Sequence, residues 1–266
     1  NELQSEDIRL ITNNQTTSFQ ENINIEISNA GVAQVKTGNE SRKNISMDKK
    51  TPNKLIVPYG KRSTLVLSDG SKVWLNSGSV LEFPAQFPGD NREVWLTSGE
   101  MYIEVASDKK KPFYVHTSEF NVRVYGTKFN LSAYANSPKS IVLVEGSVGL
   151  QSISGNEIKL TPNEQAVCTQ DGTFDTRKVD VDHFISWKNG YLTFDNALMS
   201  EVLQQIERYY NLSFNYDKDV TLKELTCNGK IILSENLDNV MTTISLLTST
   251  RYKKEDDQIY ITNEPN

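Results

Sequence analysis

Apolar and polar residues alternate along much of the chain, most clearly between Leu65 and Pro84. The alternation runs through Leu67, is interrupted by Asp69-Gly70, and resumes at Val73. An Asp-Gly pair between two alternating runs is a strong hairpin signal, because Gly adopts the left-handed turn conformation without a steric penalty. The pattern therefore predicts a β-hairpin with one buried face, in which Asp69-Gly70 forms the turn.

Runs of the same kind continue through the first two thirds of the chain, and Gly, Pro, Asn or Asp residues separate many of them. The predicted strands cover residues 8–10, 23–27, 93–97, 99–105, 113–116, 120–125, 127–133, 140–150, 157–160 and 165–168. Strands at intervals of roughly 8–12 residues favour a β-sandwich, a barrel or a stacked β-sheet module. The polar stretch 39–53 has no sustained period and is predicted to be a loop or linker.

The rhythm changes near Trp187. Two copies of a strand-helix-strand pattern follow, with strands at 191–194, 212–216, 230–233, 251–254 and 258–262 and helices at 197–210 and 237–247. The apolar positions at helical spacing are Leu198, Val202, Leu203, Ile206 and Tyr209 in the first helix, and Leu237, Val240, Met241, Ile244 and Leu247 in the second. A tandem β-α-β repeat implies two helices packed on small sheets, because neither copy can bury its apolar face alone.

These patterns predict a mainly β region followed by a small α+β domain of two β-α-β units. We divide the chain into an N-terminal β segment and linker (1–54), an all-β domain (55–186) and a C-terminal β-α-β domain (187–266). A length of 266 residues suits roughly two domains. The chain begins at Asn1 without a Met or a leader pattern, so we expect a processed or trimmed piece of a longer protein.

Composition excludes some classes of function. The net charge of -6 argues against a dedicated nucleic-acid binder, which needs a basic surface. No apolar run approaches the ~18 residues of a membrane helix, so any membrane anchor should lie outside this chain. Cys168 and Cys227 are interpreted as two separate buried thiols, with a single disulfide as the alternative. Their number leaves the cellular compartment open.

Six short motifs follow one another in the central region. They are L-x-D-G-S-x-V-x-L-N-x-x-S-x-L-x-F-P at 67–84, R-E-V-W-L-T-S-G-E-M-Y at 92–102, P-F-x-V at 112–115, G-T-x-F-N at 126–130, V-E-G-x-V at 144–148 and L-x-P-x-E-Q-A at 160–166. Each alone is a weak match, but in this order the run from Val57 to Ala166 resembles the FecR family of bacterial transmembrane anti-sigma regulators. The pattern W-x-x-G-x-L-x-F from Trp187 and E-R-Y-Y at 207–210 resemble the C-terminal domain of the Bacteroidetes-type members. That domain is in turn similar to the small secretin and TonB-receptor N-terminal domain.

The resemblance implies a function and two partners. It implies the periplasmic portion of an inner-membrane anti-sigma factor that relays a signal from an outer-membrane TonB-dependent receptor to an extracytoplasmic-function (ECF) sigma factor. The receptor's periplasmic signalling domain would be one partner. The sigma factor would bind a cytoplasmic region missing from this chain, while release by association or by proteolysis stays open. No nucleic acid, cofactor or metal is expected.

The residues themselves offer little for catalysis. The histidines, His116 and His183, are interpreted as structural. Glu100 and Glu104 share a strand face, but their Cα atoms would lie ~13 Å apart, whereas glycosidase carboxylates usually lie about 5–9.5 Å apart. We therefore expect solvent-facing charge rather than an acid-base pair, and no enzyme. A cryptic hydrolase is the weakest alternative.

Four aromatic residues support another alternative, an extracellular carbohydrate-binding β-module. Trp74, Trp95, Tyr102 and Tyr114 could form a platform for a glycan or a peptide, although a place in the sandwich core is favoured. Trp74 and Tyr102 face away from the aliphatic neighbours in their strands. They are therefore the better candidates for exposure.

The partner-binding prediction rests on the edges of small sheets. An edge strand has unpaired backbone groups to which a partner strand can add. The strands 212–216 and 258–262 are the candidates for such edges, although both could also be internal. The candidate partner-binding residues are Leu212, Phe214, Tyr216, Gln258, Tyr260 and Thr262.

Overall fold

The computed structural model describes residues 2–38, 41–216, 225–234 and 236–263. The chain divides into two compact units, Asn1–Ile185 and Ser186–Asn266. We call them the β unit and the α/β unit, and each is described by itself. The mainly β region followed by a small helix-containing domain confirms the predicted fold class.

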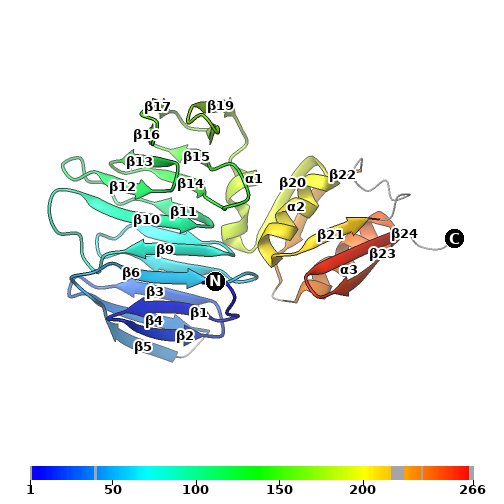
Figure 1. The fold of residues 1–266 in the computed structure, drawn as a ribbon, viewed down its shortest axis with the longest axis horizontal. Coiled ribbons are helices and arrows are strands. Elements are labelled where there is room, and N and C mark those ends of the chain that lie inside the picture. Colours follow the sequence, from blue (N-terminus) through cyan, green and yellow to red (C-terminus); the bar gives the residue numbers. More distant parts are fainter. Residues whose placement is uncertain (1, 39–40, 217–224, 235, 264–266) are drawn as a thin grey trace. The chain divides into compact units, whose positions relative to one another are not determined.

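The β unit consists of two large sheets (Figure 1). In spatial order, the nine-stranded sheet contains β17 (Glu157–Leu160), β16 (Val148–Ser152), β13 (Phe120–Val124), β12 (Phe113–His116), β10 (Arg92–Ser98), β9 (Ser79–Phe83), β6 (Asn53–Val57), β1 (Ile8–Thr12) and β2 (Gln15–Phe19). The ten-stranded sheet contains β19 (Phe174–Lys178), β18 (Glu164–Cys168), β15 (Ser140–Glu145), β14 (Lys128–Ser132), β11 (Glu100–Glu104), β8 (Lys72–Leu75), β7 (Ser63–Val66), β3 (Ile23–Ile27), β4 (Val32–Thr37) and β5 (Ser41–Ser46). The chain passes repeatedly between the sheets and advances from one end of the unit to the other, ending in the short helix α1 (Asp182–Ile185).

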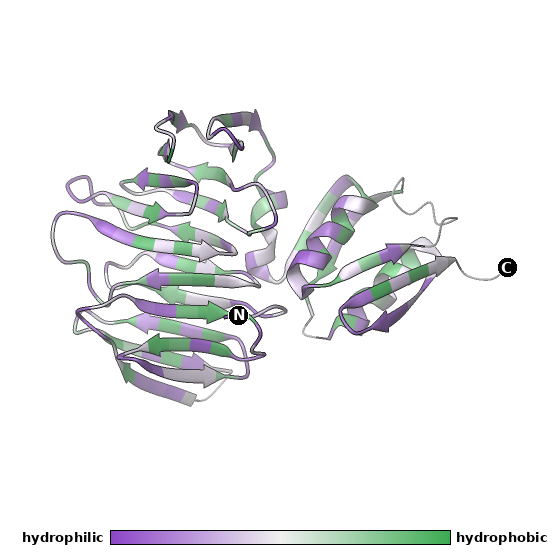
Figure 2. Cartoon of the chain, viewed as in Figure 1, coloured by the Kyte–Doolittle hydropathy of each residue, from purple (hydrophilic) through white to green (hydrophobic). Residues whose placement is uncertain are grey.

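Alternating side chains from both sheets form one continuous apolar core. In β3, for example, buried Ile residues alternate with exposed Asn24 and Glu26. Figure 2 shows the same alternation as neighbouring green and purple segments along the strands. The largest fully buried side chains include Phe83, Phe113, Phe120 and Phe129. Burial of each such side chain stabilises the fold by about 1.5–3 kcal/mol relative to exposure.

The first 54 residues belong to the same two sheets. Strand β1 pairs with β6, and β3 pairs in parallel with β7, so this segment extends the sandwich rather than preceding it. The prediction of a loop or linker at 39–53 is wrong for Ser41–Ser46, where β5 pairs with β4. Residues 47–52 form neither a helix nor a strand, and residues 39–40 lie outside the described part of the chain. The sequence of β5, SRKNIS, shows no apolar alternation because β5 is the last strand of its sheet in the part of the chain described. An edge strand has few core contacts to impose a pattern.

The hairpin that opens the motif region is confirmed. Strands β7 and β8 pair with Leu65 opposite Val73, and Gly70 has the positive φ of 86° that the turn requires. The run 140–150, expected to be one strand, is divided at Gly146, whose φ is 96°. Strand β15 lies in one sheet and β16 in the other, so this turn carries the chain across the core.

The α/β unit contains two interleaved β-α-β copies. Its elements are the 3-10 helix η1 (Ser186–Asn189), β20 (Tyr191–Leu198), α2 (Met199–Tyr210), β21 (Ser213–Tyr216), β22 (Thr226–Ile232), α3 (Leu237–Thr248), β23 (Thr250–Glu255) and β24 (Gln258–Asn263). The first strands of the two copies, β20 and β22, pair with each other, and the second strands, β21 and β23, flank β24. The two strands that flank each helix lie in different sheets, so each sheet contains strands from both copies.

The helices bury most of the predicted apolar positions. In α3, Val240, Met241 and Ile244 are buried, as predicted. Two positions were wrong. Leu198 is the last residue of β20 and is 44% exposed, and Leu247 is 63% exposed because it lies off the narrow face that α3 buries.

Candidate functional sites

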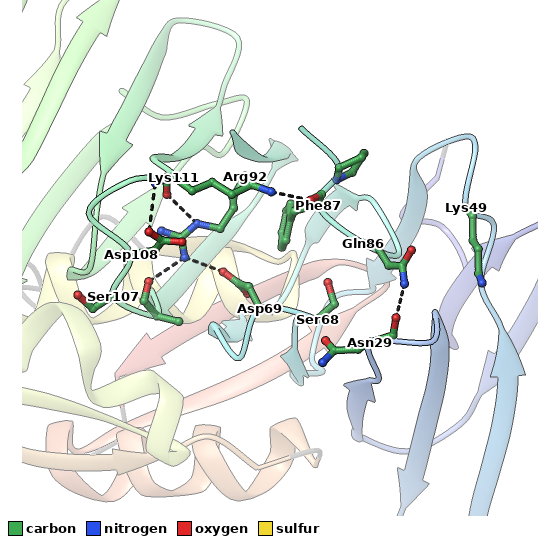
Figure 3. A pocket seen from close by; sticks show the side chains of 12 residues that line it. Asn29, Lys49, Ser68, Asp69, Gln86, Phe87, Arg92, Ser107, Asp108 and Lys111 are labelled. Carbon is green, nitrogen blue, oxygen red and sulfur yellow. Dashed lines mark hydrogen bonds and ion pairs between the residues drawn. The ribbon is translucent and has the colours of Figure 1, made fainter. Parts of the chain in front are cut away.

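The first two motifs meet at a buried ion pair between Asp69 and Arg92. Arg92 Nη1 lies 2.8 Å from Asp69 Oδ2, and the side chains are 3% and 14% exposed. The guanidinium also donates to the carbonyl oxygens of Ala106 at 2.7 Å and Lys111 at 3.1 Å (Figure 3). Its central carbon lies 5.3 Å from the ring centroid of Phe113, a residue of the third motif. One arginine therefore links three motifs.

Asp69 does more than form the predicted turn. Its carboxylate accepts a hydrogen bond from Ser71 Oγ at 2.7 Å, and the same hydroxyl accepts from the amide of Ala106 at 3.0 Å. The carboxylate therefore fixes both its own hairpin and the segment that follows β11. This ion pair was not predicted, because 23 residues separate its members along the chain.

A polar pocket of about 500 Å³ lies beside the ion pair (Figure 3). Its charged groups include Asp108 and Lys111, and Lys111 Nζ donates to the carbonyl of Phe87 at 2.6 Å. The amides of Lys110 and Lys111 donate to the Asp108 carboxylate, and the first of these bonds is the main cause that lowers its pKa. Asp108 and Lys111 therefore bind backbone groups of neighbouring loops. These contacts stabilise the fold.

Glu100 is also bound within the protein. The residue is 9% exposed, and its two carboxylate oxygens accept hydrogen bonds from the side-chain amides of Asn76 and Asn130, both at 2.8 Å. The prediction of solvent-facing charge is therefore wrong for Glu100, because asparagines next to β8 and in β14 bind its carboxylate. The carboxylate of Glu104 accepts a hydrogen bond from the Tyr102 hydroxyl at 3.3 Å, so Glu100 and Glu104 have separate partners.

Two serines of the first motif form hydrogen bonds that involve backbone carbonyls. Ser79 Oγ donates to the carbonyl of Glu100 at 3.0 Å, and the Tyr134 hydroxyl donates to the carbonyl of Ser77 at 2.8 Å. Gly99 is required at its position, since an added Cβ would lie 2.4 Å from Ser79 Cα. The motifs thus encode close approaches and buried hydrogen bonds that the fold needs.

The four aromatic residues considered as a platform lie on opposite faces of the sandwich. Trp74 and Tyr102 form a pair on the ten-stranded sheet with ring centroids 5.4 Å apart. Trp95 and Tyr114 lie on the nine-stranded sheet, and the rings of both are stacked with the imidazole of His116. The expected exposure of Tyr102 is wrong, because the residue is only 3% exposed. A single platform of all four does not form.

His116 has a clear structural role within the aromatic row. Its ring stacks on Trp95 with a centroid distance of 5.2 Å, and its Nδ1 lies 2.8 Å from Asn121 Oδ1. Its Nε2 lies 3.4 Å from a carboxylate oxygen of Glu93. These contacts fix the orientation of the imidazole.

The described residues contain neither a disulfide nor a metal cluster. Cys168 and Cys227 are free, buried and located in different units, which confirms the interpretation as separate thiols. Burial raises the pKa of both thiols. No group of three or more His, Cys, Asp or Glu side chains in the described part is placed to hold a metal ion.

The candidate partner strands have different positions in the three-stranded sheet. Strand β24 lies between β21 and β23, so strand addition to β24 is excluded. Strand β21 lies at the edge of this sheet among the described residues. However, Leu212 and Phe214 are only 9% and 8% exposed, and the side chain of Tyr216 lies outside the described residues.

The edge of β21 is partly blocked. The Glu207 carboxylate accepts a hydrogen bond from the amide of Phe214 at 2.7 Å, and this amide is one that an added strand would need. A side chain that binds an edge amide protects the edge against pairing. Strand addition at β21 would therefore have to displace Glu207.

The predicted residues of β24 share the sheet face opposite the buried Ile259 and Ile261. Gln258 and Tyr260 are exposed and Thr262 is half-buried. Asn215 and Lys253 are the cross-strand neighbours of Tyr260 on the same face. We call Asn215, Lys253, Gln258, Tyr260 and Thr262 the outer sheet face. Gln258 Oε1 accepts hydrogen bonds from Asn215 at 3.1 Å and Tyr260 at 2.8 Å, so the face is ordered by its own contacts.

The fold and its motif contacts define a long β-sandwich with an appended tandem β-α-β unit. A model described as FecR protein matches residues 53–149, and one described as FecR, C-terminal, matches residues 191–261. Together they cover more than half of the chain, which belongs to the FecR family. No curated protein matches the sequence significantly.

Two solved structures are similar over most of the chain. Both are crystal structures of a "putative anti-sigma factor" from Parabacteroides distasonis ATCC 8503, at 1.65 and 2.50 Å resolution. Each is 28% identical to this chain with a TM-score of 0.64, and the similarity covers 80% of this chain and 99% of the other. Across the described residues, every helix is too short or too polar to cross a membrane.

Proposed function

We propose that this chain is the periplasmic sensor region of an anti-sigma factor. In this proposal it relays the state of an outer-membrane TonB-dependent receptor to an ECF sigma factor. The sigma factor binds a cytoplasmic region outside this chain, across a single membrane span that is also outside it. The region has a regulatory rather than an enzymatic role.

One observation carries the proposal. The two parts of the FecR family occur in this chain in order, and each lies within a different compact unit of the fold. The similarity to the Parabacteroides protein supports the anti-sigma role, because it extends over nearly all of that chain at 28% identity. The internal contacts of Asp69, Arg92 and Glu100 agree with a regulatory role, since these charged groups are used to hold the fold.

We further propose that the receptor's signalling domain binds the outer sheet face. This surface contains Gln258 and Tyr260, the exposed members of the set of residues predicted from the sequence to bind a partner. It offers an aromatic ring, a cation and two amides, a combination that suits a partly polar protein interface. Tyr260, which is 38% exposed, is the residue expected to contribute most, because Tyr is enriched among energetically dominant interface residues.

A reporter assay in cells tests the anti-sigma role. The full-length protein is expressed with and without this region, beside a promoter that depends on the partner sigma factor. We expect wild-type cells to change reporter output when the receptor's inducer is added, and cells lacking this region to lose that response. An unchanged response without this region would contradict the proposal.

The binding surface is tested separately by pull-down with the signalling domain of the TonB-dependent receptor. Tyr260→Ala and Lys253→Glu should reduce recovery of the receptor domain, whereas Lys159→Glu in the β unit should not.

Glu207→Gln distinguishes strand addition at β21 from binding by the outer sheet face. If a receptor strand adds to β21, weakening the bond to the Phe214 amide should increase recovery, whereas binding by the outer sheet face should be unaffected.

A further inference from the structure

A shallow groove of about 780 Å³ lies on the outward face of the nine-stranded sheet, far along the chain from the FecR C-terminal region. It extends across β12, β13, β16 and β17. Its side chains include Tyr114, Asn121, Arg123, Tyr125, Gln151 and Lys159. None of these residues belongs to the buried motif contacts described above.

Gly149 makes the floor of the groove. It lies in the middle of β16, directly between Arg123 of β13 and Lys159 of β17. Its backbone is not in the left-handed region, and an added Cβ would meet only the carbonyl of Arg123 at 3.7 Å, which is ordinary contact. The backbone therefore does not require glycine. A glycine inside a strand marks a bulge, a tight bend, or a place where a ligand or another backbone approaches closely. Strand β16 pairs without a register shift on both sides of Gly149, so it has no bulge there.

Aromatic rings lie along one side of this floor. Tyr114 is part of the ordered row with His116 and Trp95, and its ring plane lies within 6° of the imidazole plane. Tyr125 is 38% exposed, and the guanidinium of Arg123 lies over its ring at 5.4 Å and donates to its hydroxyl. The rings are thus held in fixed orientations before any ligand arrives, which reduces the entropic cost of binding.

Polar side chains form a second row in the groove, across strands β13, β16 and β17. Asn121 is opposite Gln151, and Gln151 is opposite Glu157, whose carboxylate accepts a hydrogen bond from the Gln151 amide at 2.8 Å. Arg123 and Lys159 add two positive charges and Glu157 one negative charge, so no single sign dominates. Strands lie about 4.8 Å apart, so the groove spans about 14 Å from β12 to β17.

We propose that this groove binds an oligosaccharide. The C–H faces of sugar rings stack on aromatic rings, and sugar hydroxyls form hydrogen bonds with planar amide, guanidinium and carboxylate groups. The length of the groove fits several sugar units rather than one. The mixed charge favours a neutral or weakly acidic glycan over nucleic acid, which requires a basic surface. An extended peptide would instead add to the outer edge of β17, which is the last strand of its sheet among the described residues, rather than lie on the sheet face that forms the groove.

The experiment measures binding of the whole chain to defined probes by isothermal titration calorimetry and saturation-transfer NMR. The probes are cellohexaose, xylohexaose, mannohexaose and hexagalacturonate, with a Ser-Val-Ser-Val-Ser-Val peptide for comparison. We expect at least one oligosaccharide to bind and the peptide not to bind. Failure of all four oligosaccharides at millimolar concentration, or binding of the peptide alone, overturns the proposal.

Two variants locate the binding. Gly149→Leu fills the floor of the groove, and Tyr125→Ala removes an exposed ring. Each should weaken oligosaccharide binding by at least about tenfold. Lys72→Leu is the matched control, because it places the same Leu side chain on an exposed strand position of the ten-stranded sheet. Equal affinity of wild type and Tyr125→Ala overturns the proposal even if Gly149→Leu fails to fold.

Binding to the groove is independent of the proposed receptor contact. Gly149→Leu should leave receptor-domain recovery unchanged, and Tyr260→Ala should leave oligosaccharide affinity unchanged. The two proposals can therefore fail separately.

Discussion

The β unit and the α/β unit differ in how they use their characteristic residues. In the β unit, the motif residues Asp69, Arg92 and Glu100 are directed into contacts within the fold. In the α/β unit, the helices bury an apolar face but leave other large apolar residues in solvent. Six of the eight exposed large apolar or tyrosine residues of the described chain lie in this smaller unit, including Ile232 at 73% and Leu246 at 79%.

This difference separates the motif residues, which hold the fold together, from the residues that a partner can contact. Buried polar contacts are costly to change, so a motif made of them is a requirement of the fold. A partner can only contact side chains that the fold leaves accessible. The outer sheet face of the α/β unit and the groove of the β unit meet that condition, and the FecR motifs of the β unit largely do not.

The largest expected effect comes from breaking the link between the motifs. Arg92→Ala would leave the Asp69 carboxylate buried without its charge partner, and should destabilise the β unit by about 3–5 kcal/mol. Peptide-resolved hydrogen exchange would detect faster exchange in β7, β8, β10 and β12, with the α/β unit unchanged. Lys128→Ala is the control, because its ion pair with Glu145 is exposed to solvent and should contribute little to stability. Equal effects of the two variants would contradict the structural role of the motifs.

A second pair of variants tests the α/β unit within one helix. Ile244 is 1% exposed and Leu246 is 79% exposed, although both lie in α3. Ile244→Ala should cost about 2–5 kcal/mol through lost burial and a cavity, and Leu246→Ala should change stability by about 0.5 kcal/mol or less. Hydrogen exchange in the α/β unit measures both. A large loss from Leu246→Ala would mean that this residue is buried in the protein in solution.

The third test concerns Glu100. Glu100→Gln places an amide donor against a donor of Asn76 or Asn130, so one buried hydrogen bond is lost at a cost of about 1–3 kcal/mol. Glu104→Gln keeps a carbonyl oxygen for the Tyr102 hydroxyl and should cost less. Urea denaturation monitored by tryptophan fluorescence compares the two. If the order is reversed, the carboxylate of Glu100 is not held as described.

The smallest effect is a dependence of stability on alkaline pH. Burial, followed by the nearby Glu104 carboxylate, raises the pKa of Tyr102 above its ordinary value of 10.0. Above about pH 10 the unfolded tyrosine loses its proton while the folded one keeps it, so the folded state binds more protons and stability falls as pH rises. Tyr102→Phe should remove this part of the fall above about pH 10. Identical slopes for wild type and variant would show that Tyr102 is accessible to solvent.

The sequence predicted those parts of the fold in which one residue pattern determines the structure. The Asp69-Gly70 hairpin follows from local periodicity and is confirmed. The buried faces of α2 and α3 follow from it as well, and they are confirmed except at Leu198 and Leu247. Strand β5 was missed because its solvent-exposed edge position imposes no alternation. The end of β20 at Leu198 was misplaced because the same apolar residue fits either a strand or a helix.

The sites depended on contacts between distant residues. Arg92 contacts Asp69, and Glu100 contacts Asn130, only after the strands have paired. These contacts could therefore not be predicted from the spacing of the residues in the sequence. Tyr260 was predicted correctly as a residue of a strand, but the strand order that makes β24 internal depends on the pairing of both β-α-β copies. The signal that could have indicated the groove is Gly149, an unexplained glycine inside an alternating run.

Titration of the full chain with the signalling domain of the TonB-dependent receptor tests the central claim most directly. Isothermal titration calorimetry should give binding for the wild type, at least about tenfold weaker binding for Tyr260→Ala, and unchanged binding for Trp74→Ala on the ten-stranded sheet. That result would place the partner surface on the α/β unit. Unchanged binding by Tyr260→Ala, together with a loss in Trp74→Ala, would contradict the account and place the receptor contact on the β unit.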